Sequence, residues 1–343
     1  MQVVRPVVTP LATQVGFIAQ SPARMAQPAR YSPPAECSNQ EWRIMTDKMD
    51  TRKRSQPATK LVWKWLGGLV LVMLAVSALL LLNNNFSLQH VSRESLTPRL
   101  ESATELGTNW LDANAVAITQ NPALVYMVAD MANMSGSRRL QHIVDLYLSD
   151  PFVPPRFIWR RVVDEKAEVR PPTRAELDYD QEYQRWILYG SAPHLVQLTE
   201  AERADMFSPD KYIWGKRTHQ LSALLLYRKR GTNTESVEPL INHLCGGIAF
   251  EADWDVRVTD LYLQRVAFLL LAGRPDLVKP RWVERILAAQ EAEGGWKRSW
   301  HGWGPGLFAL HFNDQRPTAH ATVQGVWTLY MLKYRYPNWP QTR

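Results

Sequence analysis

Four carboxylates gather in one short stretch of the chain. Asp253, Asp255 and Asp260 lie within eight residues of one another, and Glu251 comes just before them. Carboxylates grouped in this way serve as general acid and base or hold a hard cation such as Ca2+. Asp is also common at turns and helix starts, and this structural role suits Asp255 and Asp260. We predict Asp253 and Asp260 as catalytic residues, with Trp254 forming an apolar or sugar-stacking wall beside them.

Two histidines stand at the starts of apolar segments. His219 and His320 each fall in the first turn of a predicted helix, and similar hairpins would bring both to one face together with Asp260. An imidazole titrates at about pH 6.5 and is suited to proton transfer. We therefore predict His320 as a third catalytic residue and His219 as a substrate-binding residue. The alternative is that each histidine only satisfies hydrogen bonds at a helix end.

A metal site is not predicted. Zinc needs three or four protein ligands, and His219, His320 and Cys245 are conceivable ones, but the nearby pair His243-Leu244-Cys245 is not diagnostic of a metal site. The sequence identifies no cofactor. Fingerprints of P-loop nucleotide binding, dinucleotide binding, the nucleophile elbow and HExxH metalloproteases are absent.

A turn-rich aromatic segment lies at residues 294–306, where three Trp are interleaved with five Gly. Such a loop is suited to the rim of a site for a sugar or an isoprenoid. We predict that Trp300 and Trp303 stack on the ligand and that Arg298 and His301 meet an anionic group. The alternative is that these tryptophans pack on outer helices.

Helical periodicity dominates the chain from residue 92 onward, because apolar residues recur at spacings of three and four and strand-like alternation is scarce. Strongly apolar helices alternate with more amphipathic ones, which predicts stacked helical hairpins with buried inner and exposed outer members. The predicted fold is all-α, an incomplete or complete α/α toroid over residues 84–343, with an insertion at 150–213 that forms an elaborated loop or a lid. The clearest predicted helices are Ala123–Met134, Arg139–Leu148, Arg174–Tyr189, Thr218–Arg230, Ser236–Leu244, Thr259–Ala272, Pro280–Glu291 and Thr318–Tyr334.

An uncharged run of 18 residues, Trp65–Leu82, precedes this domain and would span about 27 Å as a helix. It is longer than the apolar part of a cleaved signal peptide and no small-residue cleavage site follows, so residues 61–83 are predicted as an uncleaved signal-anchor. A cleaved signal peptide and a buried core helix are the alternatives.

The positive charge of the chain is concentrated before this run. Residues 1–64 hold ten Lys or Arg and four Asp or Glu, which accounts for six of the seven net charges. Positively charged flanks remain in the cytoplasm, so the N-terminus is predicted to be cytoplasmic and the main domain periplasmic or extracellular. Because the domain is nearly neutral, no nucleic-acid partner is predicted. Residues 1–60 are predicted as a disordered tail, of which 1–44 either lack a fold or are not translated.

One resemblance rests on the segment from Gln290 to Trp296, which reads Q-x-x-x-G-x-W and follows the aliphatic Ile286. It resembles the QW repeat of terpenoid cyclases, which have α/α-toroid domains. Arg285 stands where that repeat has an aromatic residue, and the acidic cyclase signatures are missing. The resemblance implies a motif that ties helix ends together and is not catalytic.

A second resemblance covers about residues 215–335. The helix Asp260–Gly273, the series Trp282, Ile286 and Gln290, and the helix start His320-Ala321-Thr322 resemble an uncharacterised family with a domain of unknown function, known in animals as thyroid-enriched proteins. That family is secreted or membrane-anchored and has no settled activity. The resemblance implies a location and a fold.

Two functions remain open at this stage. One is a membrane-anchored enzyme that acts on a glycan or a lipid-linked substrate. The other is a non-catalytic binding or scaffold subunit of a membrane complex. Convergence of the predicted carboxylates and histidines would favour the enzyme.

Overall fold

The computed structural model describes the chain in segments, and its contacts divide the chain into two units, residues 1–68 and 69–343. Of the tail predicted as disordered over residues 1–60, residues 1–55 lie outside the described residues, and the prediction is wrong for residues 56–60, which belong to a helix. The structure describes residues 56–87, 91–150, 157–212, 215–230, 237–297, 302–303, 310–311 and 316–340.

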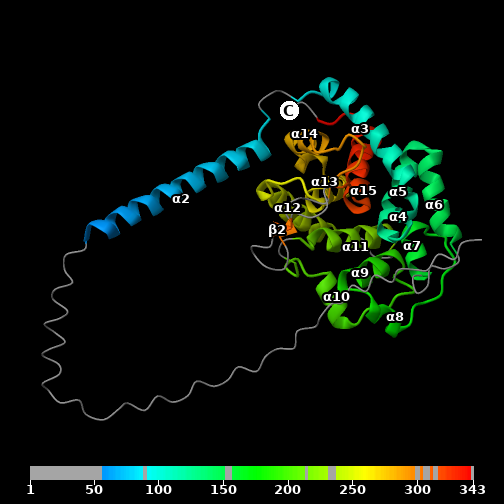
Figure 1. The fold of residues 1–343 in the computed structure, drawn as a ribbon. Helices are drawn as coiled ribbons and strands as arrows, with labels where there is room; N and C mark the ends of the chain where they lie inside the picture. The colour runs from blue at the N-terminus through cyan, green and yellow to red at the C-terminus, as the bar shows by residue number, and fades with distance from the viewer. Residues whose placement is uncertain are drawn as a thin grey trace, which may run out of the picture. The chain divides into compact units, whose positions relative to one another are not determined.

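The apolar run near the N-terminus forms helix α2, Gln56–Asn85 (Figure 1). Within the described residues, Val62–Asn85 is one helix that is long and apolar enough to cross a membrane, with a mean hydropathy of 2.6. The side chains from Val62 to Leu80 are exposed, so this helix is not part of a protein core.

Four helices open the body of the second unit: α3 (Arg93–Ala113), α4 (Ala115–Thr119), α5 (Pro122–Ser135) and α6 (Arg138–Ser149). Polar side chains cap three of them, because Ser92, Asn121 and Ser137 each accept a hydrogen bond from a backbone N–H in the first turn. The two predicted helices of this region are confirmed to within one residue at each end.

The middle region contains η2 (Phe157–Trp159), α7 (Arg160–Val163), α8 (Arg174–Tyr179), α9 (Glu182–Ser191) and α10 (Glu200–Met206). The single helix predicted over residues 174–189 is wrong. Asp180 has an extended backbone and ends α8, and Gln181 takes part in a new capping box that starts α9.

Part of the predicted insertion belongs to the core. Helix α9 packs against the later helix α11 (Arg217–Arg230), and Trp186 on α9 is fully buried. At Gly190 the backbones are so close that a Cβ atom would lie 2.3 Å from the carbonyl oxygen of Ala223. A residue larger than glycine would push the two helices apart.

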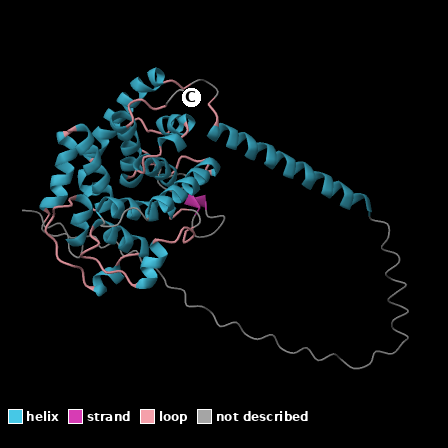
Figure 2. Ribbon diagram, turned by 180° about the vertical axis from the view of Figure 1, so that it is seen from behind, coloured by secondary structure: helices cyan, strands magenta, loops and turns pink. Residues whose placement is uncertain are grey.

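The C-terminal half continues from α11 with α12 (Glu238–Trp254), α13 (Asp260–Leu271), η4 (Pro275–Leu277), α14 (Pro280–Ala288), α15 (Ala319–Tyr330) and the π-helical turn η5 (Met331–Arg335). Strands β1 (Gly302–Trp303) and β2 (Leu310–His311) form a two-residue antiparallel pair. Helices make up nearly all the regular structure of the described residues (Figure 2), and the predicted all-α class is confirmed.

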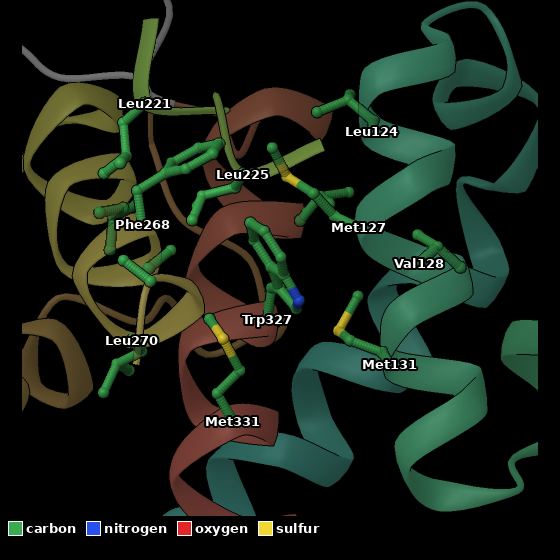
Figure 3. Packing of buried hydrophobic residues seen from close by; sticks show 14 of the residues in the cluster. Leu124, Met127, Val128, Met131, Leu221, Leu225, Phe268, Leu270, Trp327 and Met331 are labelled. Carbon is green, nitrogen blue, oxygen red and sulfur yellow. The ribbon is translucent and has the colours of Figure 1, made fainter. Parts of the chain in front are cut away.

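Trp327 on α15 lies at the centre of the core, between residues of α5, α11 and α13 (Figure 3). Its ring meets Phe268 edge-on at 5.6 Å and Tyr126 at 6.2 Å. Its indole N–H donates to Asp130 at 2.7 Å, and Arg335 pairs with the same carboxylate. The ring thus joins apolar packing to a satisfied polar contact.

The Q-x-x-x-G-x-W segment connects the end of α14 to the middle of α3. The Gln290 side chain donates to the carbonyls of Ala103 on α3 and of Gly294, at 2.8 and 2.9 Å. Trp296 is buried and donates to the carbonyl of Ile286 at 2.8 Å. Gly294 has φ +97, and a Cβ there would lie 2.2 Å from the carbonyl oxygen of Leu106. These contacts connect the end of α14 to α3.

Candidate functional site

The first turns of α11, α13 and α15 carry the histidines and one of the aspartates. Thr259 and Thr318 cap α13 and α15 by accepting hydrogen bonds from the N–H groups of the third residues that follow them. Those caps place Asp260 at the first position of α13 and His320 at the second position of α15. His219 is the third residue of α11.

Asp260 and His320 meet. His320 Nδ1 lies 3.5 Å from Asp260 Oδ2, and the two side chains are 42% and 27% exposed. The other oxygen of Asp260 accepts from the N–H of Leu261 at 2.8 Å. If Nδ1 carries the proton that faces the carboxylate, the lone pair of the ring is on Nε2, as a general base requires. The contact is long, as catalytic hydrogen bonds often are before a substrate binds.

His219 lies beside this pair, largely buried. The ring of Tyr183 packs on it with centroids 4.4 Å apart, and Gln264 Nε2 is 3.5 Å from its Nε2. Burial, with smaller effects from nearby His320 and Lys216, lowers the pKa of His219 to about 4. His219 is therefore neutral near pH 7.

A second glutamine completes the group. Gln324 is fully buried, and its Nε2 lies 3.4 Å from His320 Nε2. Gln324 Oε1 and His219 Nδ1 are both buried and have no hydrogen-bond partner among the described residues. We call the group of His219, Asp260, Gln264, His320 and Gln324 the helix-start cluster. It contains buried hydrogen-bonding atoms without a partner among the described residues, which is unusual inside a protein.

A separate ion-pair network connects α11, α12 and α13. Glu251 on α12 pairs with Arg217 on α11 at 2.9 Å and with Arg265 on α13 at 3.2 Å. Arg265 also binds Asp255 at 2.7 Å. Glu251 and Arg265 are almost fully buried, so the network fixes α11, α12 and α13 against one another. Asp255 is therefore a structural ion-pair partner.

Asp253 takes part in different contacts. Its carboxylate pairs with Lys279, and its backbone carbonyl accepts from the side chain of Asn84 at 2.9 Å. It lines a groove of about 910 Å3 together with Lys279, Trp282 and Trp339. Lys279 also lies over the ring of Trp282, 5.4 Å from its centroid. The structure brings two of the three predicted catalytic residues together and places Asp253 at this groove.

The remaining predicted residues are exposed or undescribed. Trp254 is 54% exposed. Arg298, Trp300 and His301 lie outside the described residues, and of Trp303 only the backbone, in β1, is described. The predictions for the aromatic loop therefore stay predictions.

The described part of the chain shows no group of three or more His, Cys, Asp or Glu that could hold a metal ion. Cys245 is fully buried, and burial raises the pKa of its thiol to about 11. A thiol with so high a pKa stays protonated at neutral pH and is a poor nucleophile.

Three residues that contact the histidines were not predicted from the sequence: Gln264, Gln324 and Tyr183. The two glutamines did leave a signal, because each stands four residues after a predicted site residue, in the patterns Asp260-x-x-x-Gln and His320-x-x-x-Gln. Residues four apart lie on one face of a helix. Tyr183 comes from a distant segment, and no local pattern marks it.

Comparisons with models of protein families, with curated proteins and with solved structures give no match to this chain. The case for a function therefore rests on the side chains of the site and on the apolar helix.

Proposed function

We propose that this chain is a single-pass membrane protein whose helical domain lies outside the cytoplasm and works as an enzyme on a glycan or lipid-linked substrate. The observation that carries the enzymatic part is the contact of Asp260 with the partly exposed His320. In this proposal His320 accepts a proton from the reacting group or donates one to it. Asp260 orients the ring of His320 and stabilises its protonated form.

The neighbours of His320 support this assignment. His219 is kept neutral near pH 7 by burial. Gln324 and Gln264 present carboxamides to the two rings. Both carboxamides are buried, so their contribution is to hold the two rings in position.

The anchor is supported by α2 and its flanks. The exposed apolar helix is long enough to span about 30 Å of hydrocarbon. Six Lys or Arg lie in residues 48–64, before the span, which favours a cytoplasmic N-terminus. Protease added to sealed spheroplasts or cells should digest the domain after residue 85, and protection of the domain would contradict this topology.

We also propose that the helices of the C-terminal half form hairpins of an α/α toroid. The fully buried runs of α11, α13 and α15 suit inner helices, whereas α12 and α14 keep exposed residues. Amide hydrogen exchange should then be slowest in the three inner helices.

The enzyme is tested with the full-length protein in detergent, offered envelope glycans and lipid-linked saccharides. Asp260→Asn and His320→Ala should each lower kcat by about a hundredfold or more, the usual contribution of general acid–base catalysis. Asp145→Asn, on the exposed side of α6, is the matched control and should keep full turnover. Turnover that survives His320→Ala would contradict the site.

A non-catalytic binding subunit is the second candidate, and the groove beside Asp253 favours it. The groove offers aromatic walls and an ion pair to a ligand without a titrating histidine in its lining. Absence of turnover with every substrate, together with ligand binding that Lys279→Ala or Trp339→Ala weakens, would support this candidate over the enzyme.

A further inference from the structure

The end of α2 is bound firmly to the body of the second unit through Asn84. Its amide group donates to the carbonyls of Ala252 and Asp253, both at 2.9 Å. Its carbonyl oxygen accepts from Tyr262 at 3.2 Å and from Arg285. Asn84 is fully buried, and every hydrogen-bonding atom of its side chain is used. The C-terminal turn of α12 is therefore fixed to the end of the apolar helix.

Neighbouring residues reinforce this junction. Asn85 donates to the carbonyl of Asp253 at 2.9 Å and accepts from Lys279 at 3.0 Å. Arg281 donates to the backbone carbonyl of Asn83 at 2.8 Å. The last three residues of α2 thus hold the body through α12 and α14.

The length of α2 sets the level of this junction in a bilayer. The 24 residues from Val62 to Asn85 extend about 36 Å as a helix, slightly more than the hydrocarbon core of a bilayer. If α2 spans the membrane, as proposed above, Asn83–Asn85 lie at the level of the lipid headgroups. The end of α12, hydrogen-bonded to them, must lie at the same level.

Large aromatic side chains are exposed at this place. Phe86 follows α2 directly and is 64% exposed, and Phe250 and Trp254 on α12 are 55% and 54% exposed. Phe250 and Trp254 stand four residues apart on one helix face, with ring centroids 6.1 Å apart. Trp254 is next to Asp253, which accepts hydrogen bonds from both Asn84 and Asn85.

We propose that Phe86, Phe250 and Trp254 form a membrane-contact face that rests in the headgroup region of the same bilayer that α2 crosses. Aromatic side chains favour this region because their rings are apolar and their edges tolerate water. The inference rests on the proposed anchoring, and it fixes the orientation in which the domain faces its substrates.

The test uses full-length protein in phosphatidylcholine–phosphatidylglycerol vesicles, with the environment-sensitive fluorophore NBD attached to single cysteines. The background is Cys37→Ser, and Cys245 is too buried to react. Trp254→Cys and Phe250→Cys report on the proposed face. Tyr179→Cys, 81% exposed on α8, is the matched control for an exposed aromatic position elsewhere on the body.

NBD at positions 250 and 254 should be quenched about twofold by lipids that carry a nitroxide near the headgroup, while NBD at position 179 stays unquenched. A fourth label, Leu74→Cys in the middle of α2, reports on the anchoring itself. Quenching at 74 with no quenching at 250 and 254 would overturn the membrane-contact face and leave the anchor intact. Absence of quenching at 74 would overturn the anchor on which the face depends. A blue shift at 254 without lipid quenching would show that a second copy of the chain, and not lipid, covers the face, and would also overturn the proposal.

Discussion

Two polar groups sit close together in the C-terminal half of this protein and are built in opposite ways. The ion-pair network of Glu251, Arg217, Arg265 and Asp255 has contacts of 2.7 to 3.2 Å. The helix-start cluster has contacts of 3.4 to 3.5 Å and includes buried atoms without partners among the described residues. Both groups include residues of α11 and of α13.

The difference separates a structural from a functional use of polar residues. A buried ion pair is stable only when its charges are fully paired, and the network meets that condition. Unused hydrogen-bonding groups cost free energy in the folded state and persist where a ligand or a reaction uses them. The contrast predicts that the network governs stability and that the helix-start cluster can be changed with little loss of stability.

The largest effect is expected in the network. Glu251→Leu removes the carboxylate that pairs with Arg217 and one of the two carboxylates that pair with the buried Arg265, and should lower the free energy of unfolding by about 3–5 kcal/mol. Urea unfolding in detergent, followed by circular dichroism, measures the change. Glu105→Leu is the control, because it breaks an exposed ion pair with Arg139 and should cost at most about 1 kcal/mol. Equal losses for the two variants would contradict the comparison.

Sequence patterns predicted the apolar helices well because burial repeats with the helical period. The predicted helix Thr259–Ala272 and the observed one, Asp260–Leu271, differ by one residue at each end. The helix predicted over Ser236–Leu244 continues instead to Trp254. The extension contains Glu251. A charged residue is expected to be exposed to solvent, and only the structure shows that Arg217 and Arg265 lie beside Glu251 and pair with it.

The meeting of His320 with Asp260 follows the prediction that three similar helix starts share one face. The separate placement of Asp253 could not be predicted from its nearness in sequence, because α12 ends between it and Asp260. The role of Asn84 was hidden as well. Asn84 is one of three consecutive asparagines after an apolar run, and only the tertiary structure shows that it is buried.

A smaller change in the free energy of unfolding is expected when the pH is lowered, because His219 becomes protonated in the unfolded chain. Its pKa is about 4 in the folded protein and about 6.5 in the unfolded chain. Between these values the unfolded chain binds more protons, so stability is complete above pH 6.5 and falls as pH drops toward 4. The loss should be on the order of 2 kcal/mol. His219→Gln should remove most of this dependence in urea unfolding at pH 7 and pH 4.5, and an unchanged dependence would show that His219 is not responsible.

The smallest effect is expected inside the helix-start cluster, at Gln324. Gln324→Leu removes a buried carboxamide whose oxygen has no partner in the described part of the chain, so the free energy of unfolding should change by less than about 1 kcal/mol. Gln220→Leu is a matched control, because Gln220 is equally buried and its Oε1 likewise has no partner among the described residues, but its Nε2 donates to the carbonyls of Met206 and Ser208 at 2.9 and 2.7 Å. That variant leaves two carbonyls unpaired and should lose about 1–3 kcal/mol. A loss at position 324 as large as at position 220 would mean that the carboxamide of Gln324 serves the fold, and the division between the two polar groups would not hold.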